Sequence, residues 1–219
     1  MLTARCYRLR EEMRRSLPRA MRDAMRPARV TVYDPEAIVR LLNQGKVRFV
    51  LMGTHGIVGW RSETRATDDI DVLIANRDHA KAVRIIRRAF PQLRAVDVPN
   101  VVTRFLEPGI KDPVIDLMRP SAEIYRAVFR HTHAVGTKYR IPDLEMALVC
   151  KFAAMTSPTR TIKKKYLDAG DFTDIVEFNR EILDIAKLQR LAEKVKPGAG
   201  MEIAKLVDDI DAGRIIQIR

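Results

Sequence analysis

Cysteine and tryptophan are scarce in this chain, which holds two Cys and one Trp in 219 residues. Cys6 and Cys150 lie far apart, and Cys150 sits within an apolar helical run, so we expect neither a disulfide scaffold nor a zinc site. No apolar run approaches the ~18 residues that a membrane-spanning helix needs, and the first residues lack the apolar core of a secretory signal. We therefore expect a cytoplasmic protein with no membrane partner.

Acidic residues are outnumbered: 28 Asp and Glu stand against 40 Lys and Arg, which gives a formal net charge of +12. Residues 1–29 carry half of this excess, because they hold nine Arg and three acids. An excess of this size points to a polyanionic partner. The segment 1–29 is predicted to be a basic arm or helix, and both a solvated face and RNA contact are open for it.

Apolar periodicity predicts an α+β chain, and the hydrophobic fraction of 47% fits a folded globular protein. We expect a mixed sheet with flanking helices over residues 30–140, and a C-terminal helical bundle over 141–219. The expected helices are 35–44, 53–60, 77–90, 121–130, 143–156, 171–179, 182–195 and 200–212. The expected strands are 47–52, 69–75, 101–106 and 114–118, with a hairpin at 133–141.

Two acids lie on one face of the predicted strand 69–75, which reads Asp-Ile-Asp-Val-Leu-Ile-Ala. Side chains alternate along a strand, so Asp69 and Asp71 share a face with Leu73 while the intervening apolar residues share the other. Two carboxylates about 7 Å apart along a strand repel each other unless a cation bridges them. Mg²⁺, which takes one or two carboxylates together with substrate phosphates, suits this pattern.

A third acid, Asp116, lies in the later predicted strand 114–118. A neighbouring strand would bring it to the same ions, so the chain is predicted to carry a platform for two Mg²⁺ ions roughly 4 Å apart. Asp69 and Asp71 would bridge the ions, and Asp116 would be a ligand and the general base. The alternative is that Asp69 and Asp116 only cap turns or pair with Arg.

The turn between the strand 47–52 and the acidic strand offers phosphate-binding groups. Gly53 and Thr54 place backbone N–H groups and a hydroxyl where phosphate is commonly bound. Arg61 and Arg65 flank the acidic strand and would neutralise a triphosphate, although solvation at the surface is an equal alternative for Arg61. The run Lys163-Lys164-Lys165 is either an exposed face or part of a surface for RNA.

Lys151 is unusual because apolar residues surround it within the predicted helix 143–156. A lysine in such a position is rarely buried without a partner. It either extends its ammonium group to the solvent or meets an anion such as a nucleotide phosphate, and we favour the anion.

These motifs together resemble the nucleotidyltransferase (polymerase β-like) superfamily, and more narrowly its AbiEii-type group, which includes toxins of type IV toxin-antitoxin systems. The resemblance spans roughly residues 34–180. The matching residues are Gly53, Arg65, Thr67, Asp69 and Asp71, while Thr54 replaces the second small residue of the family's turn. The resemblance also implies a site lysine, an arginine and an acid-rich helix start, which correspond to Lys151, Arg160 and one of Asp168, Asp171 and Asp174, with Asp171 favoured by register.

The resemblance implies transfer of a nucleoside monophosphate from an NTP to an acceptor hydroxyl, with Mg²⁺ as cofactor. Asp69, Asp71, Asp116 and Lys151 would be catalytic, and Gly53, Thr54, Arg65, Thr67, Lys151 and Asp171 would bind the nucleotide. RNA, such as a tRNA 3′ end, is the expected acceptor in a toxin-like setting with an antitoxin partner. The alternatives are a small-molecule or protein acceptor, and a non-catalytic RNA-binding protein on the same scaffold.

Overall fold

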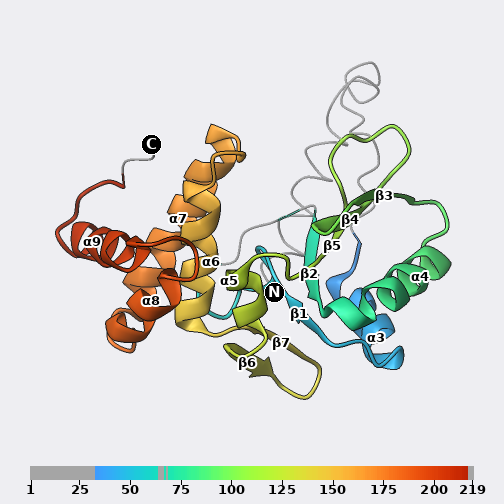
Figure 1. Ribbon diagram of the computed structural model, residues 1–219, viewed down its shortest axis with the longest axis horizontal. Helices are drawn as coiled ribbons and strands as arrows, with labels where there is room; N and C mark the ends of the chain where they lie inside the picture. The colour runs from blue at the N-terminus through green and yellow to red at the C-terminus, as the bar shows by residue number, and fades with distance from the viewer. Residues whose placement is uncertain (1–32, 64–66, 68, 217–219) are drawn as a thin grey trace, which may run out of the picture. The chain divides into compact units, whose positions relative to one another are not determined.

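The computed structural model describes residues 33–63, 67 and 69–216 (Figure 1). Contacts between Cα atoms group Tyr33–Arg219 into one compact unit and Met1–Val32 into another. The predicted basic arm 1–29 and the predicted triphosphate ligand Arg65 lie outside the described residues. The predicted domain boundary near residue 140 stays a prediction.

The described chain alternates strands and helices up to residue 142 and is helical thereafter. Its first part contains α3 (Pro35–Gln44), β1 (Phe49–Leu51), β2 (Ile70–Ile74), η1 (Asn76–Asp78), α4 (His79–Ala89), β3 (Arg94–Val98), β4 (Val102–Leu106), β5 (Ile115–Met118), α5 (Glu123–Val128), β6 (Thr132–Val135) and β7 (Tyr139–Pro142). The second part contains α6 (Leu144–Thr156), α7 (Ile162–Asn179), α8 (Ile185–Ala192) and α9 (Ala199–Asp211). None of the helices in the described ranges is long and apolar enough to cross a membrane.

Five strands form a mixed sheet in the order β1-β2-β5-β4-β3, and β6 pairs with β7 in a separate hairpin. Only the β2–β5 pair is parallel in the five-stranded sheet. Its register places Asp71 opposite Asp116, and the antiparallel β4–β5 pair places Arg104 opposite Asp116 from the other side. Three charged residues therefore lie in one row across the middle of the sheet.

The two faces of β2 pack into different cores, as strand alternation requires. Ile70, Val72 and Ile74 join a core with α3 and α4, where Ile38 and Ile86 are fully buried. Leu73, on the other face, joins a second core made mostly by the helices α6 to α9. Asp71 thus faces the helical part of the molecule, which Figure 1 shows on the opposite side of the sheet from α4.

α6 and α7 form an antiparallel pair that packs against this second face (Figure 1). α6 begins at an N-cap, Asp143, whose side chain accepts a hydrogen bond from the Met146 amide. Apolar residues surround this helix on nearly all sides, and Met146, Leu148 and Phe152 are among its fully buried side chains. α6 is therefore the central helix of the second core.

Three predicted elements differ in the structure. The segment 53–60 forms consecutive turns in place of a helix, with Gly53 in the left-handed region at φ 58°. The strand Arg94–Val98 was not expected, because its sequence Arg-Ala-Val-Asp-Val has few apolar residues, and it is an edge strand. α7 begins at Ile162, nine residues before the predicted start at 171, because Gly170 does not interrupt it.

Candidate active site

The candidate site is built on Asp71 and Asp116, which lie side by side on the parallel strands β2 and β5. Both carboxyl groups line one cavity of about 270 Å³. Two acids at facing positions of adjacent strands repel each other when both are ionised. This pair is therefore electrostatically unfavourable unless protons or a cation neutralise it.

The pKa values of the two carboxyl groups reflect that repulsion. Burial raises the pKa of Asp71 to about 7, and the charges of Asp69 and Asp116 add to the increase, while Lys151 and Arg160 oppose it. Burial also raises the pKa of Asp116 to about 6, opposed first by the charge of Arg104. Perturbed acids in a cavity are typical of functional sites.

Asp69 lies one residue before β2 and is the third acid of the predicted set. Its Oδ1 accepts a short hydrogen bond from the hydroxyl of Thr67. Its charge raises the pKa of both Asp71 and Asp116, so the three acids are neighbours. Over the described ranges, however, no three Asp, Glu, His or Cys side chains stand close enough to hold one ion together.

The donor set of the Asp71–Asp116 pair fits a hard divalent cation. Asp116 Oδ1 is buried and accepts no hydrogen bond from the described part of the chain. Such an oxygen is costly to leave without a partner. Mg²⁺ commonly binds through one or two carboxylates and completes its shell with water and substrate phosphate, so a pair is a sufficient protein contribution.

The turn after β1 approaches Asp71 so closely that only glycine fits. A Cβ atom on Gly53 would lie 2.1 Å from Asp71 Oδ2, and the residue has φ 58°. The turn is closed by a 2.9 Å hydrogen bond from the Gly56 amide to the Met52 carbonyl. Gly53 and Gly56 line the cavity, and Thr54 lies in the same turn.

Lys151 is buried, with 7% of its surface exposed, and it is held between two acids of α7. Its Nζ donates to Asp168 Oδ1 at 3.0 Å and to Asp171 Oδ2 at 2.7 Å. Arg160 Nε lies 2.5 Å from the second oxygen of Asp168. The expectation of a partnered anion is therefore met by carboxylates of the chain itself, and both Lys151 and Arg160 also line the cavity.

The acids of α7 do not cap the helix or face the solvent, which had been open for two of them. α7 starts at Ile162, so Asp168, Asp171 and Asp174 lie within the helix at a spacing of three residues and share a face. Asp168 and Asp171 are each 2% exposed. All three instead hold cations that come from other segments.

Arg61 is one of these cations, and solvation at the surface is wrong for it. Its Nη1 lies 2.6 Å from Asp171 Oδ1, and its Nε lies 2.7 Å from Asp174 Oδ2. The hydroxyl of Ser62 also donates a short hydrogen bond to Asp174. The turn segment after β1 is thereby fastened to α7.

Sequence analysis missed three cavity residues: Arg104, Arg119 and Tyr125. Arg104 Nε lies 3.6 Å from Asp116 Oδ2, and Arg119 Nη2 lies 2.9 Å from Asp97 Oδ1. The one available signal was Arg104 itself, a charged residue in the middle of the otherwise apolar strand Val102–Leu106. Tyr125 and Arg119 carried no such signal.

Comparison with known proteins places this geometry in a known fold. No protein-family model matches the chain, and no curated protein sequence matches it. The solution structure of the antibiotic-resistance factor ANT(2'')-Ia matches with a TM-score of 0.52 at 16% identity, over 84% of this chain and 97% of that one. The chain thus has a nucleotidyltransferase-like α+β fold.

Two further solved structures are similar at lower scores. An antigenic nucleotidyltransferase-like protein from Paracoccidioides brasiliensis has a TM-score of 0.45 at 15% identity, over 79% of this chain and 89% of that one. The Megavirus polyadenylate synthase has a TM-score of 0.46 at 11% identity, over 77% of this chain and 37% of that one.

Proposed function

We propose that this chain is an Mg²⁺-dependent nucleotidyltransferase that moves a nucleoside monophosphate from an NTP to an acceptor hydroxyl. The observation that carries the proposal is the facing pair Asp71 and Asp116 on adjacent strands of a cavity, with Gly53 against Asp71. The nucleotidyltransferase-like fold supports it. The acids would hold Mg²⁺, which when bound supplies positive charge to the phosphates and to the attacking oxygen.

The chain's own residues would then act on nucleotide and acceptor. Asp116 would take the proton of the acceptor hydroxyl on Oδ1, the oxygen that has no hydrogen-bond donor from the described residues. The freed oxygen would bond to the α-phosphorus of the NTP, and the bond from that phosphorus to the bridging oxygen would break. Pyrophosphate carries the electron pair away, so the step balances.

The cations of the inner wall suit the nucleotide. Lys151 and Arg160 line the cavity and act on the Asp71 carboxyl group, since both lower its pKa. Backbone amides of the turn at Gly53 and Thr54 would meet the phosphates, as at other glycine turns. Asp171 would orient Lys151 through the 2.7 Å contact.

RNA is the acceptor that we propose, with a tRNA 3′ end as the particular case, and the AbiEii-type resemblance adds a toxin role with an antitoxin partner. The net charge of +12 supports a polyanionic acceptor. It disfavours a cationic small molecule, because like charges reduce encounter.

The test is label transfer from each of four α-labelled NTPs to total RNA with Mg²⁺. The wild-type chain is expected to label RNA, and Asp71→Asn to reduce the rate by a factor of about 100 or more, because a ligand of the transferring site is lost. Asp112→Asn, which changes an exposed acid in the β4–β5 loop, is the matched control and should label RNA normally. Absence of labelling by the wild type, or equal labelling by Asp71→Asn, would refute the proposal.

A second candidate is transfer to a small molecule or protein side chain, and one observation favours it: the similarity in fold to an antibiotic-resistance factor. The same assay with RNA-free metabolite and protein fractions separates the two. A third candidate, a non-catalytic RNA-binding protein, predicts salt-dependent RNA binding with no label transfer and no effect of Asp71→Asn.

A further inference from the structure

The cations around the cavity fall into two groups according to the carboxylate they act on. Lys151 and Arg160 lower the pKa of Asp71, whereas Arg104 and Lys164 lower the pKa of Asp116. The first group is fixed by the carboxylates of α7. The second group comes from β4 and from the first turn of α7, which are two separate walls.

Arg104 is poised at Asp116 without a tight bond to it. It lies directly opposite Asp116 across the β4–β5 pair, and its Nε stands 3.6 Å from Asp116 Oδ2. Half of its side chain, 49%, is exposed, and it lines the cavity. A guanidinium group in this position retains free N–H donors for a second anion.

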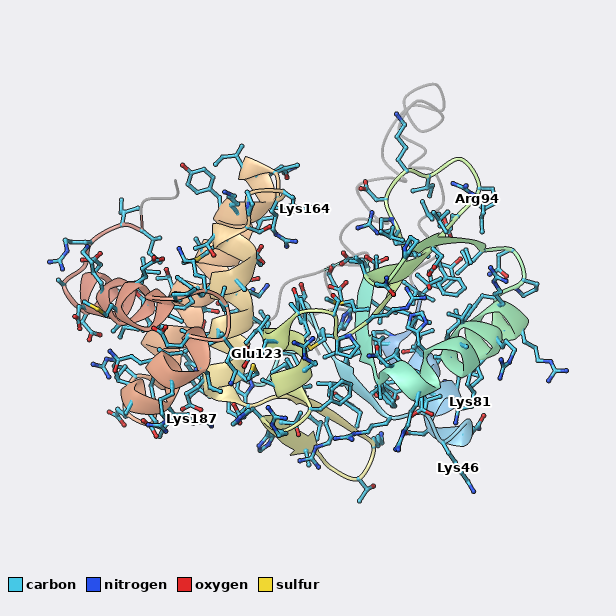
Figure 2. All side chains as sticks on the ribbon, viewed as in Figure 1. Lys46, Lys81, Arg94, Glu123, Lys164 and Lys187 are labelled. Atoms are coloured by element: carbon cyan, nitrogen blue, oxygen red, sulfur yellow. The ribbon has the colours of Figure 1, made fainter. Side chains whose placement is uncertain are left out.

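Lys164 stands on the other wall, one helical turn outward from the cavity. Arg160 and Asp168 both line the cavity, and Lys164 lies four residues from each along the chain, on the same face of α7 as Asp168. Its side chain is exposed near the free end of α7 (Figure 2). The neighbouring Lys163 is rotated by about 100° around the helix and shares a face with Leu167.

We propose that Arg104 and Lys164 form an acceptor clamp, which binds the last phosphodiester of a single-stranded RNA 3′ end and thereby positions its hydroxyl at Asp116. This inference rests on the proposed function, because it assigns Asp116 to the acceptor. Two cations on opposite walls beside the proton-accepting carboxylate suit an acceptor that carries a phosphate next to its hydroxyl. RNA has that chemistry and a neutral sugar alcohol does not.

Equilibrium binding tests the clamp without catalysis. The probe is a fluorescent single-stranded RNA with a 3′ hydroxyl, titrated with the full chain in EDTA and without NTP. Arg104→Gln and Lys164→Gln are each expected to weaken binding about fivefold and to lower the salt slope by about 0.7, the value for one phosphate contact on a single strand. Lys163→Gln is the matched control and should change the affinity less than twofold.

A second RNA locates the contact. In this probe an uncharged methylphosphonate replaces only the last phosphodiester. Wild-type affinity should fall about fivefold, while the two clamp variants should bind both RNAs equally, because the contact is already lost. Arg104→Lys, which retains the charge, should recover part of the affinity and shows that the loss is not a folding defect.

The outcomes separate this inference from the proposed function. If the clamp variants lose as much affinity on the methylphosphonate probe as the wild type, or if the wild type binds no RNA, the clamp is refuted. Coupling to the terminal phosphate without label transfer supports the clamp and refutes the transferase. In the transfer assay, clamp variants should raise KM for RNA and leave KM for the NTP unchanged.

Discussion

Gly53 and Asp71 show at the scale of single residues how tightly this site is built. The glycine has φ 58° and approaches the Asp71 carboxyl group at a distance that excludes any side chain. Met52, the preceding residue, donates its amide to the Asp71 carbonyl at 2.8 Å. The backbone of the turn thus fixes the position of one of the two site acids.

Gly53→Ala is expected to abolish nucleotide transfer, because the new Cβ would displace Asp71 Oδ2. Gly109→Ala is the matched control: Gly109 has φ 79° but nothing within 4 Å of its added Cβ. Both variants should lose about 1 to 2 kcal/mol of stability from the left-handed backbone, and only Gly53→Ala should lose activity as well. Thermal unfolding and label transfer measure the two effects; equal activity in the two variants would contradict the role assigned to the turn.

The raised pKa of Asp71 makes stability depend on pH. Its ordinary value is 3.8, and the folded chain raises it to about 7, so the folded state holds a proton that the unfolded state releases. The contribution is therefore fully present at low pH and is lost as the pH rises through about 7.

The expected result in EDTA is that the Tm of the wild type, relative to Asp71→Asn, falls between about pH 5 and about pH 8. Subtracting the variant removes the effect of groups that both proteins share. Saturating Mg²⁺ should raise the wild-type Tm more at the higher pH, since it binds the ionised carboxylate. A Tm difference that is constant with pH would contradict the electrostatics described for the pair.

At the scale of elements, the contacts between α6, α7 and the turn segment depend on buried charge. Lys151 of α6 is held by Asp168 and Asp171, and Arg61 of the turn segment is held by Asp171 and Asp174. One carboxylate, Asp171, thus joins both cations. Pairs of this kind stabilise little in themselves, but removal of one partner leaves an uncompensated buried charge.

Lys151→Met is therefore expected to destabilise the chain by about 3 to 5 kcal/mol. Asp171→Asn added to Lys151→Met should restore part of the loss, because it removes one of the unpaired charges. Lys205→Met is the control: Lys205 pairs with Asp209 but is 76% exposed, and its loss should cost under about 0.5 kcal/mol. Urea unfolding measures all three, and a Lys151→Met loss as small as that of Lys205→Met would contradict the buried network.

At the scale of the whole molecule, the five-stranded sheet supplies residues to both cores. Leu73 and Val50 belong to the core of the helices α6 to α9, while their strand neighbours Val72 and Leu51 belong to the core of α3 and α4. Tyr33–Arg219 accordingly forms one compact unit by its contacts. Shared strands should make its unfolding cooperative.

Leu73→Ala is expected to cost about 2 to 5 kcal/mol and to lower the unfolding midpoint equally for two probes. The single Trp60, which donates its Nε1 to the Pro142 carbonyl at 2.9 Å, reports locally by fluorescence, and far-UV circular dichroism reports on the helices. If residues 141–219 formed an independent domain, the two midpoints would separate.

Sequence patterns within single elements predicted much of this fold. Alternation in residues 69–74 places Asp71 opposite in direction to Ile70 and Val72, and the structure has them in that arrangement. The apolar surroundings of Lys151 correctly required an anionic partner. The turns at 53–60 were missed because Trp60 and Arg61 are held by contacts with Pro142 and α7, which no local pattern contains.

The sequence by itself determined which side chains share a face, because the period of a strand or helix is set by the local backbone. Only the tertiary structure decided that β2 pairs in parallel with β5 and places Asp71 against Asp116, that Arg104 completes the row, and that Asp168 and Asp171 hold Lys151. These pairings join segments that are 17 to 45 residues apart. Their choice depends on how whole elements pack, which the periodicity of one element does not contain.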